Sequence, residues 1–121
     1  MAAGDYTIYD EASSNASGNV TIVGQSAAAA AALTFYVGFN PSRVTLYKTG
    51  AAGATADDIY FMVRGLGTQC WFADESAQTL GGAATAITVA EGSDSYEGQW
   101  SVTISSGSQT NSHFYTLIIE R

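Results

Sequence analysis

The sequence has few clusters of side chains that could bind a metal or act in catalysis. The densest of them is the acidic segment at residues 91–97. It holds Glu91, Asp94 and Glu97 with two serines between them. Carboxylate and hydroxyl oxygens are ligands for hard cations such as calcium, but dedicated calcium loops use a D-x-D-x-D-G type of register that this segment lacks. We interpret the three acids as solvated turn residues, and the sequence leaves open whether they bind a cation.

Histidine-assisted or thiol catalysis and a zinc site would depend on His113 or Cys70, each of which is the only residue of its kind. No G-x-S-x-G motif accompanies the histidine, and a zinc site needs several Cys or His ligands. Cys70 lies in the segment Q-C-W-F, where we expect a buried small hydrophobic residue, and a single cysteine cannot form an intrachain disulfide. We therefore expect no catalytic residues, no metal, no cofactor and no enzyme activity.

The charge balance limits the classes of partner. Eleven acidic residues against four basic residues give a net charge of −7, whereas nucleic acids and anionic membranes are bound through clustered Lys and Arg. The N-terminal residues lack the basic and apolar regions of a secretory signal, and no apolar run is long enough to span a membrane. We expect a soluble protein, made in the cytoplasm, that binds neither nucleic acid nor membrane. Because only 12% of its residues are charged, its surface is typical of one that other protein covers.

The length of 121 residues predicts one domain, residues 1–121, with an extended N-terminal arm at residues 1–18. Short β-branched and aromatic segments recur between clusters of Gly, Ser and Asp. Their spacing predicts an all-β fold, an antiparallel β-sandwich or β-barrel of about eight strands. The alanine run at residues 27–32 is too short for a stable helix and is interpreted as a loop or a strand start. The expected strands are residues 19–24, 32–39, 43–49, 58–64, 68–73, 86–90, 99–105 and 113–119.

Adjacent aromatic residues occur on four of the expected strands. Neighbouring residues of a strand point to opposite faces, so one ring of each pair must face away from the core. That second ring lies either under a loop or in an interface, and the low charge of the chain favours an interface. The pairs are Phe35-Tyr36, Tyr60-Phe61, Trp71-Phe72 and Phe114-Tyr115.

The segment at residues 36–50, Y-V-G-F-N-P-S-R-V-T-L-Y-K-T-G, places Asn40-Pro41 as a turn between two strands, which can then pair as a hairpin or cross between two sheets. It resembles the G-F-x-P-x-x-V-x-L-x-N/K-T segment of the head decoration proteins of tailed bacteriophages, also called cement or head-stabilisation proteins. Residues 9–24 resemble the opening of that family, and F-Y-T-L-I-I-E-R at residues 114–121 resembles its terminal strand. These segments cover about a third of the chain.

The resemblance implies a structural virion protein that binds the outside of a phage capsid and bridges major capsid protein subunits, often as a trimer or dimer. The family has no catalytic residues to carry over. Because Arg43 and Lys48 are two of only four cations and lie beside tyrosines, we predict that an exposed aromatic and basic face of the expected hairpin contacts the capsid protein. The predicted contact residues are Tyr36, Arg43, Tyr47, Lys48, Tyr60 and Arg64.

Two other functions remain open from the sequence. A carbohydrate-binding or adhesion module would use Trp71, Tyr96 and Trp100 as a stacking platform for sugar rings. A phage tail component would share the composition of a decoration protein and differ in its position in the particle.

Overall fold

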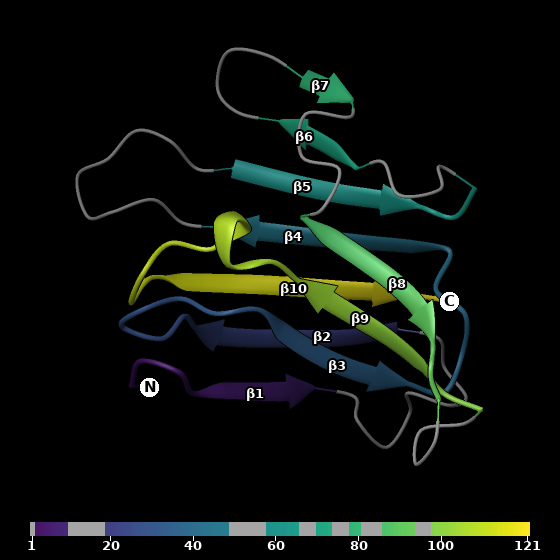
Figure 1. Cartoon of the computed structure of the whole chain (residues 1–121), viewed down its shortest axis with the longest axis horizontal. Helices are drawn as coiled ribbons and strands as arrows, with labels where there is room; N and C mark the ends of the chain where they lie inside the picture. The colour runs from purple at the N-terminus through teal and green to yellow at the C-terminus, as the bar shows by residue number, and fades with distance from the viewer. Residues whose placement is uncertain are drawn as a thin grey trace.

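A computed structural model of the chain describes residues 2–9, 19–48, 58–65, 70–73, 78–80, 86–93 and 98–121. These residues form two antiparallel sheets, one of seven strands and one of three, and a single 3-10 turn at Ser106–Ser108. The smaller sheet crosses in front of the middle of the larger one (Figure 1). The all-β fold is confirmed as a sandwich of two open sheets and not as a closed barrel.

The seven-stranded sheet has the order β1-β2-β10-β4-β5-β6-β7, and the three-stranded sheet has the order β3-β9-β8. The strands of the larger sheet are β1 (Tyr6–Tyr9), β2 (Asn19–Gln25), β10 (Phe114–Glu120), β4 (Arg43–Lys48), β5 (Asp58–Val63), β6 (Trp71–Ala73) and β7 (Gln78–Leu80). Those of the smaller sheet are β3 (Leu33–Val37), β9 (Trp100–Ile104) and β8 (Ile87–Glu91).

All eight strands expected from the sequence are present, and two more accompany them. Within the expected N-terminal arm, residues 6–9 form the edge strand β1, which pairs with β2 from Tyr6 opposite Gly24 to Tyr9 opposite Thr21. The three-residue strand β7 pairs with β6. Both additional strands are too short to show an alternating pattern of their own, so pairing with a neighbour defines them.

The core lies between the two sheets and follows from the alternation of side chains along each strand. In β2 and β10 every second residue is buried, β4 contributes Val44 and Leu46 to the same layer, and β3, β8 and β9 supply the opposite layer. Thr45 of β4 is also buried, on the other face of the larger sheet. Each fully buried aliphatic side chain contributes about 1.5–3 kcal/mol of transfer free energy, which is enough for a domain of this size without disulfides or metals. The largest fully buried aliphatic side chains are Ile22, Val44, Leu46, Ile87, Val102, Ile104, Leu117 and Ile119.

The Asn40-Pro41 turn does not close a hairpin. β3 pairs with β9 in the smaller sheet, whereas β4 pairs with β5 and β10 in the larger sheet, so the chain crosses between the sheets at this point. Ser42 holds the crossover in place. Its N–H donates to the carbonyl of Glu120 at 2.8 Å, and its carbonyl accepts from the N–H of Arg64 at 2.9 Å. Of the two arrangements that the turn allows, the crossover is therefore the one observed.

The alanine run forms a loop between β2 and β3, as the sequence predicts, and buried polar side chains anchor it. Gln109 accepts from the hydroxyl of Ser26 at 2.9 Å and donates through Nε2 to the carbonyl of Ala31 at 2.8 Å. The side-chain oxygen of Asn111 accepts from the N–H of Ala30 at 2.8 Å. Small side chains let this loop lie close to residues 105–112, where these polar partners reside.

At one end of the core, an aromatic ring replaces a missing side chain. Gly24 lies between Tyr6 and Tyr115 in the inward-facing row of three neighbouring strands. The ring of Tyr115 occupies the space that a Cβ of Gly24 would take, and Tyr6 packs edge-to-face on Phe35 with ring centroids 5.2 Å apart. The Tyr115 hydroxyl is buried without a hydrogen-bond partner among the described residues, and burial raises the pKa of Tyr115 to about 12.

The buried Tyr115 hydroxyl predicts a loss of stability at alkaline pH. Below pH 10 both the folded and the unfolded chain keep this proton, but between pH 10 and 12 only the unfolded chain releases it. The free energy of unfolding should therefore fall as pH rises, by at most about 2.7 kcal/mol from this group. Urea unfolding of the wild type and of Tyr115→Phe at about pH 8 and about pH 11 measures the effect. Equal losses in both proteins would show that Tyr115 does not contribute.

Candidate interaction surface

The outer face of the seven-stranded sheet carries large apolar side chains. It consists of the residues that point away from the smaller sheet, and four of them are strongly exposed: Tyr9 at 54%, Phe114 at 51%, Tyr47 at 44% and Val63 at 38%. Half-buried side chains fill the spaces between them, among them Val23, Ile59, Phe61, Trp71 and Ile118. Arg43 and Glu120, which are opposite each other in the register, are the charged residues of this face among the described residues.

Arg43, Phe61 and Trp71 form a stack on this outer face. The guanidinium carbon of Arg43 lies 5.2 Å from the centroid of the Phe61 ring. On the other side, Phe61 stacks on Trp71 with centroids 6.0 Å apart and an angle of 15° between the ring planes. Three neighbouring strands, β4, β5 and β6, supply one member each, so the stack is held on regular structure. Trp, Tyr and Arg are the residue types that most often dominate the energy of protein interfaces.

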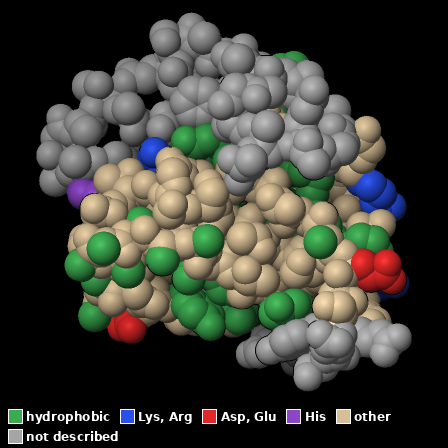
Figure 2. Space-filling model, in the orientation of Figure 1, with side chains coloured by type: hydrophobic (Ala, Val, Ile, Leu, Met, Phe, Trp, Pro, Cys, Tyr) green, Lys and Arg blue, Asp and Glu red, His purple; other side chains and the backbone are tan. Residues whose placement is uncertain are grey.

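The opposite outer face, on the three-stranded sheet, is different in character. Its side chains are mainly small and uncharged, and most of the charged groups visible from this side lie toward the edges of the molecule (Figure 2). Tyr36 is its exposed aromatic residue, at 39%. The alternating residues of this face are Thr34, Tyr36, Thr88, Ala90, Ser101 and Thr103.

Two of the six predicted contact residues, Arg43 and Tyr47, lie together on the outer face of the larger sheet. Tyr36 lies on the outer face of the smaller sheet, on the other side of the molecule, because the chain crosses between the sheets after β3. The expectation that Tyr36 shares a face with Arg43 and Tyr47 is therefore wrong.

Tyr60 and Lys48 point to the inner side of the larger sheet. Tyr60 lies opposite Leu46 in the register and is only 7% exposed, so the expectation that it belongs to an exposed face is wrong. Lys48 follows Val44 and Leu46 at intervals of two, which places it on the core side at the end of β4. Its Nζ lies 5.9 Å from the centroid of the Tyr60 ring. Lys48 therefore does not share the face of Arg43 and Tyr47.

Arg64 lies just beyond the end of β5, at the end of the sandwich. Its Nε donates to the carbonyl of Pro41 at 3.2 Å, and its Nη2 donates to the carbonyl of Asn40. Both acceptors belong to the crossover between the sheets. Arg64 is therefore separate from the outer face and is placed beside the turn that follows β3.

The predicted contact residues did not include Phe61, Trp71 and Val63, although these residues complete the surface around Arg43 and Tyr47. The aromatic pairs indicated that one ring of Tyr60-Phe61 faces outward, but not which one. That choice depends on the pairing of Tyr60 with Leu46 across β4 and β5, and no local pattern contains it.

Groups for catalysis are sparse among the described residues. Cys70 is fully buried, as predicted, and burial raises the pKa of its thiol to about 11. No cluster of three or more His, Cys, Asp or Glu side chains lies close enough to hold a metal in the part of the chain that the structure describes. Glu91 is exposed, and Asp94 and Glu97 lie outside the described residues. No helix in the described ranges has the length and apolar character to cross a membrane.

The two tryptophans do not form one platform. Trp71 belongs to the outer face of the larger sheet, whereas Trp100 lies on the inner side of β9, where it is opposite Glu91 and Val37. Tyr96 lies outside the described residues. A flat sugar-binding surface that uses both Trp71 and Trp100 is therefore not present.

Comparison of the chain with protein-family models, with curated proteins and with solved structures finds no match.

Proposed function

We propose that this chain is a structural, non-enzymatic virion protein that binds the outside of a tailed-phage capsid and bridges major capsid protein subunits, as a trimer or dimer on the shell. The proposal rests on the resemblance of residues 9–24, 36–50 and 114–121 to head decoration proteins. The supporting observation is the outer face of the seven-stranded sheet, with the Arg43–Phe61–Trp71 stack across β4, β5 and β6 and exposed Tyr47 and Val63 on the same face.

A protein partner fits this face better than other classes of partner. An apolar sheet surface with few charges and a rigid aromatic and arginine cluster is typical of the desolvated centre of a protein interface. The net charge of −7 opposes binding to packaged DNA or to anionic membranes. Beside the stack, the exposed Tyr47 offers a hydroxyl for hydrogen bonds at the rim.

The mechanism we propose is stabilisation by mass action. A protein that binds the assembled shell and not its separated subunits stabilises the shell by its binding free energy. Binding across the boundary between two subunits produces this preference, since the complete binding surface exists only in the assembled shell. Repetition at every equivalent position of the shell multiplies the effect.

The abundance of the protein in purified particles tests its location. We expect a copy number comparable to that of the major capsid protein, measured by quantitative mass spectrometry, and loss of the protein from particles should lower their resistance to heat or chelation. A copy number of only a few per particle would contradict a shell position and favour the rival tail component. Absence from particles, together with glycan binding that Trp71→Ala abolishes, would favour an adhesion module instead.

A further inference from the structure

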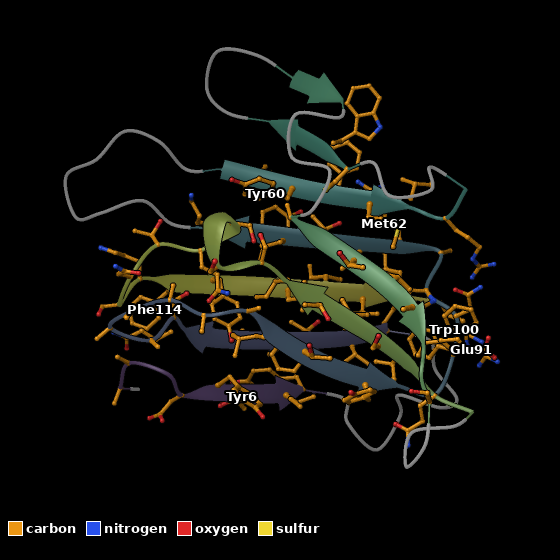
Figure 3. All side chains as sticks on the ribbon, in the orientation of Figure 1. Tyr6, Tyr60, Met62, Glu91, Trp100 and Phe114 are labelled. Carbon is orange, nitrogen blue, oxygen red and sulfur yellow. The ribbon has the colours of Figure 1, made fainter. Side chains whose placement is uncertain are left out.

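A cavity of about 410 Å³ lies at the end of the sandwich where the chain crosses between the sheets. It is distinct from the outer face, because Met62, Val89 and Trp100 line it from the inward sides of the two sheets. Its other lining residues lie beyond the strand ends, in the crossover and just after β5. Figure 3 shows Met62 on the larger sheet and Trp100 and Glu91 on the smaller sheet near this end of the molecule. The lining residues include Asn40, Pro41, Met62, Arg64, Val89 and Trp100.

The wall of the cavity changes from apolar to charged toward its rim. Met62 is buried, Val89 and Trp100 are half-buried, and Arg64 is exposed. An apolar group can therefore enter between Met62, Val89 and Trp100 while an anionic group remains near Arg64. The size of the cavity is within the usual range for sites that bind small ligands or single side chains.

Arg64 is positioned like a binding residue. Its Nε and Nη2 are held by the carbonyls of Pro41 and Asn40, which fixes the plane of the guanidinium. A guanidinium has more N–H groups than these two bonds use, and its fork matches the two oxygens of a carboxylate. Among the described residues, no carboxylate lies within ion-pair distance of Arg64.

Glu91 supplies an acceptor at the same end. It lies opposite Trp100 in the register of β8 and β9, and it shares the inward side of β8 with Val89, which lines the cavity. Its side chain is exposed, so it can accept a hydrogen bond from a peptide N–H at the rim. A second carboxylate near Glu91 would be repelled, which limits a fitting ligand to one negative charge beside Arg64.

We propose that this cavity binds the C-terminal residue of a peptide chain that ends in an apolar side chain. The Cα of such a residue bears the apolar side chain, the carboxylate and the peptide N–H. The side chain would lie against Trp100 and Met62, the carboxylate would pair with Arg64, and the N–H would donate to Glu91. A sugar fits less well, because its several hydroxyls need more polar partners than Asn40 and Arg64 provide in the lining. The inference does not rest on the proposed function, since the cavity and the outer face are different sites.

The test uses the full chain labelled with ¹⁵N and follows the Trp100 indole and Arg64 Nε–H signals by NMR. Titration with N-acetyl-leucyl-leucine is expected to shift both signals with a Kd of about 0.1–1 mM, while the Trp71 indole stays in place. The C-terminal amide of the same dipeptide should bind at least about tenfold more weakly, because it lacks the charge that Arg64 pairs with. Arg64→Gln should weaken binding of the free acid by a similar factor, whereas the matched variant Arg43→Gln should bind it as the wild type does.

Several results would overturn the proposal. Equal binding of the acid and the amide would remove the role of the carboxylate, and this comparison needs only the wild-type protein if Arg64→Gln does not fold. Tighter binding of N-acetyl-leucyl-glutamyl amide than of the free acid would show that an internal acidic residue is the ligand. Tighter binding of glucuronic acid would assign the cavity to a sugar. Absence of any shift of the Trp100 indole with the free acid would also refute it.

Discussion

Replacing Gly24 with alanine is expected to lower the free energy of unfolding by about 3 kcal/mol. A Cβ at this position would lie 2.4 Å from Oη, 2.5 Å from Cζ and 2.9 Å from Cε1 of Tyr115. These atoms belong to a ring that is 2% exposed, so it cannot swing away without moving its neighbours in the core. Urea unfolding followed by tryptophan fluorescence measures the change.

Two further variants separate the clash from the general effect of adding a methyl group. Gly107→Ala is the matched control, because nothing lies within 4 Å of the added Cβ, and its stability should stay within about 0.5 kcal/mol of the wild type. Tyr115→Phe should not rescue Gly24→Ala, since two of the three close atoms are ring carbons. Tyr115→Leu should rescue part of the loss. A Gly24→Ala protein as stable as the Gly107→Ala protein would show that the ring does not fill this space.

Reversing the charge of Arg43 is expected to weaken binding to undecorated heads by at least about 30-fold, if the outer face of the larger sheet is the docking surface. In Arg43→Glu a carboxylate would replace the guanidinium over the negatively polarised face of the Phe61 ring. The stack would lose its cation and the rim would gain a repulsive charge. Co-sedimentation of the variant with heads, over a range of protein concentrations, measures the affinity.

The two exposed tyrosines on opposite faces provide a matched control for this prediction. Tyr47 is 44% exposed on the larger sheet, and Tyr36 is 39% exposed on the smaller sheet. We expect Tyr47→Ala to weaken binding to heads and Tyr36→Ala to leave it unchanged. The reverse result would assign docking to the three-stranded sheet. Unchanged binding in Tyr47→Ala, Tyr36→Ala and Arg43→Glu would show that neither face docks on the capsid through these residues.

The local pattern of the sequence was sufficient to predict the strands but not their pairing. The segment at residues 19–22, for example, alternates the apolar Val20 and Ile22 with polar Asn19 and Thr21, and this period of two identifies both the strand and its buried residues. Asn40-Pro41 indicated a turn, yet a turn of this kind is compatible with a hairpin and with a crossover. Tyr36 was grouped with Tyr47 because the contact face was predicted for the hairpin arrangement, whereas the observed crossover places the two residues on opposite faces.

The candidate surface was predicted in part for a related reason. Arg43 and Tyr47 were placed correctly on one face, since residues of one strand at even spacing must share a face. Tyr60 and Phe61 are both aromatic, so hydrophobicity cannot decide which of them points inward. The register that pairs Tyr60 with Leu46 decides it, and that register joins segments that residues 49–57 separate in the sequence.

The position of β10 in the larger sheet has a consequence for how the chain acquires its structure. β10 is the latest of the described strands in the sequence, yet it lies between β2 and β4 and pairs with both along their length. During synthesis, β2 and β4 therefore emerge with open hydrogen-bonding edges that stay unpaired until β10 arrives. Pairings between such distant segments are slow to form, and open edges can pair with other chains. One strand thus joins the two halves of the sheet and closes the edges through which nascent chains would aggregate.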